Sequence, residues 1–406
     1  MNSKFLLTAA LISTSVLATA QQKDNLAYAI TGKPANAYFW ADIKQIDITT
    51  GKVVKTLFEA DKTKYTTTFI NKVDGDAAKI NPTAYGTAAC ALDTRHNRLY
   101  FAPMHFSEIQ YLDLSKNEAN FTVVKKRIVP AQGTSAYLTE DAQITRMVIA
   151  PDGYGYALTN DANHLIRFST DKKNTVEDLG KLSDATADAS VSIHEKYGSW
   201  GGDMVADAFG KLLIVSAKHN VFSIDVNDKT ATHIGAITGL PVNYTTNGVV
   251  VNNDGNLVVS SANVFDGLYT VDIKTLAATK IVSDDKTFNA SDMANANCLN
   301  QKEYDAMKAT GTVENSITTK KSAAVFPNPV VGNKFNVIFK NQPAGTYNVV
   351  LTDISGKAMQ TNSVSITKGE ETKTININGR HVRGFYMVKV LNASKKLVST
   401  EKVVLD

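Results

Sequence analysis

The chain has 406 residues, of which 43% are hydrophobic and 20% are charged. This length predicts two or three domains, and the composition is that of a globular protein with substantial hydrophobic cores. The formal net charge is only +4, and the lysine and arginine residues are scattered along the chain. Charge and its distribution therefore argue against an electrostatic surface for nucleic acid.

The N-terminal residues have the plan of a secretory signal. Lys4 supplies a positive charge, residues 5–17 form a short and mostly apolar stretch, and residues 18–20 are small. We therefore predict a cleavable signal peptide at residues 1–20, with a buried N-terminal helix as the alternative. No other segment has the ~18 consecutive apolar residues of a membrane-spanning helix, so we expect no transmembrane segment.

Residues 21–300 predict a β-propeller. Runs of alternating apolar and polar residues recur here, separated by turn sequences such as Asp-Gly. One hairpin pattern occurs four times, at residues 91–102, 149–160, 205–217 and 251–262, and a second hairpin follows each copy. Two successive hairpins make a four-stranded sheet. Repeated small sheets are typical of propeller blades, because stacking them around an axis buries both faces of each sheet.

The two ends of this region predict how the ring closes. Residues 26–57 supply three strands of a blade, and its missing innermost strand matches residues 291–299. The pattern gives five blades, or six if residues 65–85 contain a degenerate sheet; a β-sandwich and an open β-solenoid are the alternatives. The region resembles extracytoplasmic propellers of the YVTN/NHL/WD40-like class, and this resemblance implies a fold but no activity.

The two cysteines, Cys90 and Cys298, both fall in predicted innermost strands of adjacent blades. A disulfide between them would close a very long loop and staple the ring. Two buried thiols are the alternative, because a bridge requires Cα atoms within ~7 Å of each other. The sequence leaves both possibilities open.

The C-terminal part predicts a polar linker at residues 301–322, starting with a helical turn, and a small Ig-like β-sandwich at residues 323–406. Four short motifs occur there in order, and their residues are Pro327, Asn328 and Pro329; Asp353, Gly356 and Lys357; Gly384 and Tyr386; and Lys402. With these motifs the tail resembles the type A C-terminal sorting domain of cargo exported by the type IX secretion system of Bacteroidetes.

The resemblance implies passage through the periplasm and across the outer membrane, with an extracellular or surface-attached destination. Its implied partners are the type IX export machinery and the peptidase that removes the sorting domain. An Ig-like adhesion domain that stays attached is the alternative.

The propeller sequence contains no nucleophile elbow, zinc-binding helix, P-loop or EF-hand loop, and its histidines are dispersed. Polar loops instead precede the predicted innermost strands, where a propeller brings side chains together at one end of its channel. The candidate ligand-binding residues in these loops and strand starts are Asp203, Asp292, Arg146, Asn247, Trp200 and Tyr244.

The first four of these candidates would form a polar ring, and the two aromatic residues would stack on a sugar or a flat ligand. Carboxylate and amide oxygens would also suit Ca²⁺, and no other cofactor is predicted. The structural alternative is that small polar residues occur there because strands crowd at the axis.

The sequence therefore favours an exported binding module for a glycan, peptide or protein over an enzyme. The alternative is an extracellular hydrolase or lyase that uses the carboxylates at the channel mouth. A structural role at the cell surface is a third possibility.

Overall fold

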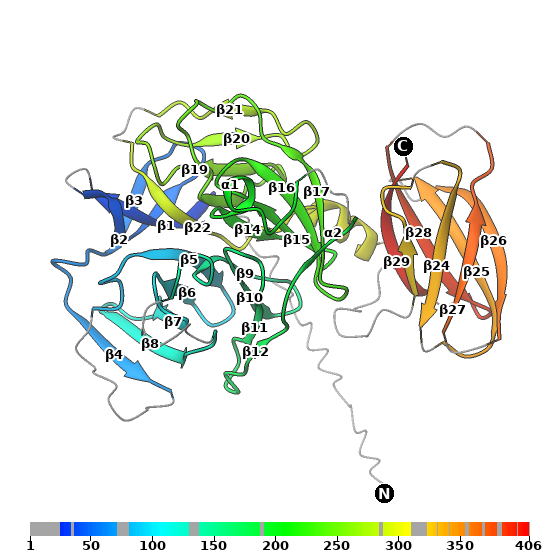
Figure 1. The fold of residues 1–406 in the computed structure, drawn as a ribbon, viewed down its shortest axis with the longest axis horizontal. Coiled ribbons are helices and arrows are strands. Elements are labelled where there is room, and N and C mark those ends of the chain that lie inside the picture. The colour runs from blue at the N-terminus through cyan, green and yellow to red at the C-terminus, as the bar shows by residue number, and fades with distance from the viewer. Residues whose placement is uncertain are drawn as a thin grey trace, which may run out of the picture.

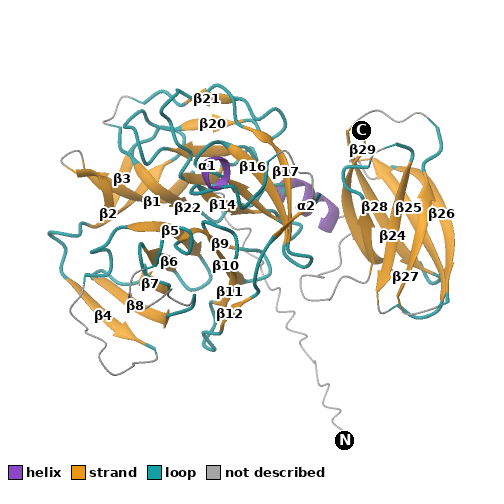
Figure 2. Ribbon diagram, viewed as in Figure 1, coloured by secondary structure: helices purple, strands orange, loops and turns teal. Residues whose placement is uncertain are grey.

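The computed structural model is an all-β protein with two short helices in its described part (Figures 1 and 2). The described residues are 25–33, 36–70, 81–129, 138–186, 191–283, 287–309, 323–330, 332–340, 342–353, 357–367, 370–379, 384–395 and 397–405. The predicted signal peptide and most of the predicted linker lie outside these ranges. Neither α1 (Lys196–Ser199) nor α2 (Gln301–Ala309) is long and apolar enough to span a membrane.

Five antiparallel sheets form the N-terminal domain, and the strands of each follow one another from the innermost to the outermost. The first sheet is β22 (Ala290–Ala294), β1 (Leu26–Lys33), β2 (Asn36–Asp47) and β3 (Val53–Phe58). The second sheet is β5 (Thr87–Asp93), β6 (Arg98–Pro103), β7 (Glu108–Asp113), β8 (Ala119–Lys126) and β4 (Tyr65–Phe69). The third sheet is β9 (Ile144–Ile149), β10 (Tyr154–Thr159), β11 (Leu165–Ser169) and β12 (Val176–Asp178).

The fourth sheet is β14 (Asp203–Ala206), β15 (Leu212–Val215), β16 (Asn220–Asp225), β17 (Thr230–Ala236) and β13 (Ser183–Asp184). The fifth sheet is β18 (Gly248–Val251), β19 (Leu257–Ser260), β20 (Tyr269–Val271) and β21 (Ala278–Lys280). Two outermost strands, β4 and β13, pair in parallel with their neighbours. The described part of residues 65–85 is therefore an added edge strand of the second sheet.

The hydrophobic core shows why these sheets form a ring. Five core clusters are present, and each one is built from two neighbouring sheets: second and third, third and fourth, fourth and fifth, fifth and first, first and second. The five innermost strands contact each other in the same cyclic order. Each sheet thus buries both of its faces against neighbours, as propeller stacking requires.

The ring closes through β22, which comes from the C-terminal end of the domain and pairs with β1 from its N-terminal end. The predicted closing strand was too long, because β22 ends at Ala294 and not at residue 299. The chain then crosses beneath the fifth sheet, where Asn295 and Asn297 both donate to the carbonyl oxygen of Val251 at 2.8 Å. It continues to the fourth sheet, where Leu299 forms a parallel bridge with Asp207.

The C-terminal domain is a seven-stranded sandwich (Figure 1). One sheet is β23 (Ala323–Phe326), β24 (Lys334–Lys340) and β27 (Glu370–Asn376). The other is β26 (Ala358–Ile366), β25 (Gly345–Asp353), β28 (Gly384–Asn392) and β29 (Leu397–Leu405). Alternate residues of these strands face a single core, which includes Phe335, Phe339, Tyr347 and Tyr386. This alternation is what the sequence shows from residue 323 onwards.

Candidate functional site

Three of the predicted site residues meet at the axis of the ring and are completely buried. Asp203 begins β14, Asp292 lies in β22 and Arg146 lies in β9, and each is 0% exposed. Asp203 accepts hydrogen bonds from the backbone N–H groups of Met204 (2.6 Å) and Val249 (2.7 Å). The axis is therefore closed by polar side chains at this level and does not present them at an open mouth.

Asp292 is bound to the neighbouring strand β5 through Cys90. Its Oδ1 accepts from the backbone N–H of Cys90 at 3.0 Å and from the Cys90 thiol at 2.9 Å. Burial raises the pKa of Asp292 well above its usual range, and the negative charge of Asp203 raises it further. Burial likewise raises the pKa of Asp203, while backbone N–H donors oppose the shift.

Arg146 is held by backbone carbonyl groups. Its Nε donates to Gly201 (2.9 Å), its Nη1 donates to Thr159 (3.1 Å), and its Nη2 donates to Ser199. Burial lowers the pKa of Arg146 to about 10, and the charge of Asp203 opposes this shift. All three carbonyl groups belong to loops at the end of the ring where the innermost strands begin, so Arg146 fixes these loops to the axis.

The other three predicted residues do not join this cluster. The expected aromatic surface of Tyr244 is absent, because its side chain is 1% exposed and its hydroxyl donates to the carbonyl groups of Val259 and Gly267. Asn247 accepts from the backbone N–H of Ala262 at 3.2 Å within its own sheet. Trp200 is half-buried, and the Lys196 ammonium lies 4.9 Å from its ring centre.

Both cysteines are free thiols in the structure. Cys90 is fully buried at the axis, and Cys298 lies beyond the end of β22, in the segment that crosses to the fourth sheet. The expectation that both lie in innermost strands is therefore wrong for Cys298. Burial raises the pKa of Cys298 to about 12 and that of Cys90 well above its usual range, so neither thiol has the thiolate character of a nucleophile.

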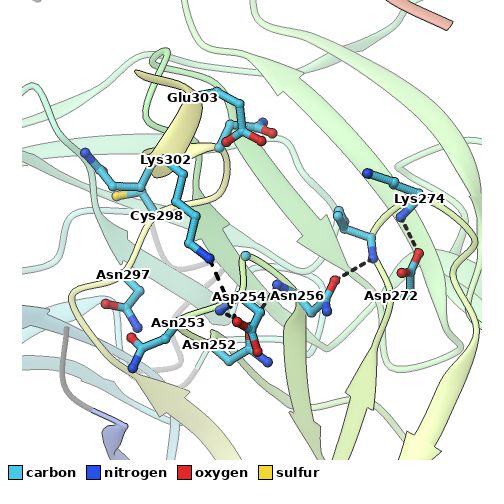
Figure 3. Close-up of a pocket in the computed structure, with 14 residues that line it drawn as sticks. Asn252, Asn253, Asp254, Asn256, Asp272, Lys274, Asn297, Cys298, Lys302 and Glu303 are labelled. Carbon is cyan, nitrogen blue, oxygen red and sulfur yellow. Dashed lines mark hydrogen bonds and ion pairs between the residues drawn. The ribbon is translucent and has the colours of Figure 1, made fainter. Parts of the chain in front are cut away.

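A polar pocket that the sequence did not indicate lies at the opposite end of the ring, where the innermost strands finish. It has a volume of about 270 Å³. Figure 3 shows side chains from the turns of the fifth sheet, including Asn252 and Asp254, facing Lys302 at the start of α2. Lys302 and Asp254 form an exposed ion pair at 3.8 Å. These segments are far apart in sequence, so no local pattern could have identified the pocket.

The tail motifs have identifiable structural roles. Asn328, between two prolines, acts as an extra partner for the last strand: its Nδ2 donates to the Lys402 carbonyl (2.7 Å) and its Oδ1 accepts from the Val404 N–H (2.9 Å). Tyr386 belongs to the sandwich core. The Lys402 ammonium lies 4.0 Å from the ring centre of Phe385.

The turn motif is described only in part. Asp353 accepts from the backbone N–H of Lys357 at 3.0 Å, which closes the turn between β25 and β26. Gly356 lies outside the described residues. Pro327 and Pro329 flank the strand partner Asn328, and Gly384 begins β28.

Replacing Asn328 by Ala should loosen the C-terminal strand. The substitution leaves one N–H and one C=O group of β29 without their partner, which should cost about 1–3 kcal/mol. Hydrogen exchange of the amides in residues 397–405 should accelerate. Asn336→Ala is the control, because Asn336 only accepts from the exposed Thr374 hydroxyl in the other sheet; equal acceleration of β29 in both variants would refute this role.

Comparisons with known proteins agree with the two-domain architecture. Residues 324–406 match the family described as the secretion system C-terminal sorting domain. No curated protein sequence matches the chain. Solved structures are similar only at low identity, so these similarities concern the fold alone.

Three of these structures illustrate the range. A nidogen/laminin complex is 11% identical over 66% of this chain and 97% of that chain, with a TM-score of 0.38. PorZ, a surface component of the type IX secretion system of Porphyromonas gingivalis, is 13% identical over 93% and 51%, with a TM-score of 0.30. A protein of unknown function from Bacteroides thetaiotaomicron is 14% identical over 66% and 70%, with a TM-score of 0.39.

The sandwich fold, the ordered motifs and the family match lead to one conclusion about the tail. Residues 324–406 are a secretion system C-terminal sorting domain, which directs the chain through type IX secretion to the cell surface or the extracellular space.

Proposed function

We propose that the propeller is an exported binding module whose ligand contacts the end of the ring where the innermost strands begin. We call this end the loop face and define it by the segments 81–86, 191–202, 237–247 and 281–289. These segments lead into β5, β14, β18 and β22, respectively.

The observation that supports this proposal is the distribution of exposed hydrophobic side chains. The three most exposed large hydrophobic residues of the described chain are Val242 (99%), Val282 (86%) and Tyr197 (82%). Each lies in a different segment of the loop face, and Tyr85 adds a partly exposed ring in a fourth. Scattered exposed residues are normal on a protein surface, but one in each of four corresponding loops is typical of an interaction site.

The alternative function, a hydrolase or lyase based on Asp203 and Asp292, is supported less well. A general acid or base must come within hydrogen-bond distance of its substrate. Both carboxyl groups are fully buried and already accept backbone hydrogen bonds. Calcium binding at the axis faces the same obstacle, and among the described residues no group of three or more His, Cys, Asp or Glu side chains is placed to hold a metal ion.

A screen of glycans, peptides and Ca²⁺ against the full chain tests the proposal. Both tryptophans, Trp40 and Trp200, lie in the propeller, so tryptophan fluorescence reports its thermal unfolding separately from the tail. A ligand at ~100 times its Kd should stabilise the propeller by about 2.7 kcal/mol.

Variants then locate the site of any ligand found. Tyr197→Ser should abolish the stabilisation. Val54→Ser is the matched control, because Val54 is an exposed hydrophobic residue (56%) on the outer strand β3. A ligand whose effect survives Tyr197→Ser and Val242→Ser but is lost in Asp292→Asn would instead place binding at the axis.

A further inference from the structure

The two buried aspartates approach each other from sheets that are not adjacent in the ring. Asp203 belongs to the fourth sheet and Asp292 to the first, and β18 of the fifth sheet lies between them in the cyclic order. The Asp203 side chain extends along the axis, where it reaches the Val249 N–H of β18 and forms a side-chain hydrogen bond with Asp292. The contact therefore spans the centre of the ring.

One oxygen of this pair lacks an ordinary donor. Oδ2 of Asp292 is buried, and no N–H, O–H or S–H group of the described residues donates to it. Its partner across the axis is a carboxyl group, and two ionised carboxylates cannot form a hydrogen bond because neither carries a hydrogen. A proton held by one of the two groups supplies the missing donor.

The charged groups around the pair require the same proton. The titratable groups that face it are the Cys90 thiol from β5 and the Arg146 guanidinium from β9, while β18 contributes only a backbone N–H. Asp161 interacts with Arg146 from a half-buried position. With one proton, the pair carries a single negative charge that balances Arg146; with none, a second negative charge is buried without a partner, which is unfavourable.

We propose that Asp203 and Asp292 share one proton in the folded propeller and that this proton is part of the closure of the ring. Asp292 lies on β22, the strand that joins the two ends of the domain, and Asp203 lies across the axis from it. Loss of the proton places two like charges at the axis and pushes β22 away from β14. The closure is thus sensitive to pH.

The direction of this sensitivity follows from the raised pKa values of the pair in the folded state. The unfolded chain has ordinary Asp pKa values of ~3.9. The stabilisation by the shared proton is complete below that pH and is lost as the pH rises through the folded-state pKa. The propeller should therefore become less stable as the pH increases, in contrast to proteins whose carboxylates are paired with cations.

Thermal unfolding of the full chain from about pH 4 to about pH 9, followed by tryptophan fluorescence, tests the proposal. Asp292→Asn keeps an oxygen for the Cys90 N–H and offers an N–H to Asp203 in place of the proton. We expect its Tm to exceed that of the wild type at the alkaline end and to depend less on pH. Asp42→Asn is the matched control: Asp42 is also buried (2% exposed), but it has Lys33 at 3.7 Å, so this variant should keep the slope of the wild type.

A spectroscopic measurement tests the proton directly. The infrared spectrum of the full chain at neutral pH, with the aspartate side chains ¹³C-labelled, should contain the C=O band of a protonated Asp, and this band should be lost in Asp292→Asn and Asp203→Asn. An unchanged pH slope in a folded Asp292→Asn variant would overturn the proposal. If that variant does not fold, the absence of a protonated Asp band in the wild type would overturn it.

Discussion

Gly202→Ala should severely destabilise the propeller, by about 4 kcal/mol or more. Gly202 has φ +87°, a left-handed conformation that is unfavourable for other residues. A Cβ atom at this position would lie 1.9 Å from the carbonyl oxygen of Val215 and 2.7 Å from the Cα atom of Ser216. Because both obstacles are backbone atoms of the paired strand, the start of β14 must move, and Asp203 moves with it.

Gly210→Ala separates the two causes of this effect. Gly210 has nearly the same backbone angle (φ +89°), but a Cβ atom there would have no atom within 4 Å. This variant should therefore lose only the conformational term, about 1–2 kcal/mol. Thermal unfolding by tryptophan fluorescence compares the two variants, and equal losses would show that the close approach at Gly202 has no energetic consequence.

Arg146→Met should cost about 3–5 kcal/mol, the range found when one partner of a buried charged interaction is removed. Methionine fills a similar volume but cannot donate to the carbonyl groups of Thr159, Ser199 and Gly201. The substitution also removes the positive charge that faces Asp203 at the axis. Stability and loop order should both decrease, and hydrogen exchange in residues 196–202 should accelerate.

Arg167→Met is the control for this prediction. Arg167 pairs with Glu177 at 2.7 Å in the third sheet, but the Glu177 side chain is 58% exposed. Exposed ion pairs of this kind contribute about 0–1 kcal/mol. Equal losses in the two variants would show that Arg146 acts as an ordinary surface residue, contrary to its complete burial.

The sequence predicted the fold from features that are local. Each hairpin carries its own alternation and turn residues, so the sheets at residues 91–102, 149–160, 205–217 and 251–262 are visible without tertiary information. The pairing of the two chain ends was also predicted, because the first sheet lacked a strand. The length of the closing strand was not, since its end is set by contacts of Asn295 and Asn297 with another sheet.

The candidate site was harder to predict. The position of Asp203, Asp292 and Arg146 at the starts of innermost strands placed them near the axis, and the structure does bring them together. Their burial depends on the small diameter of a ring with five innermost strands, which no local pattern reveals. The same limit applies to Tyr244, whose hydroxyl partners lie 15 and 23 residues further along the chain.

Buried axial polar groups and exposed loop residues indicate a division of roles within the propeller. The axis holds the ring together through Arg146, Asp203 and Asp292, and the loop face carries Tyr197 and Val242 towards solvent. The sandwich domain adds the export signal in a separate core. Substitutions at the axis should therefore change stability first, and substitutions on the loop face should change binding first.

Export of the chain with and without its sandwich domain is the decisive measurement. The full chain and a chain lacking residues 323–406 would be produced in a bacterium with an active type IX system, and the location and unfolding temperature of the propeller would be measured in both. We expect the full chain at the cell surface or in the medium and the shortened chain in the periplasm, with the same propeller unfolding temperature. Equal export of both chains would contradict the role of the sandwich as the sorting domain.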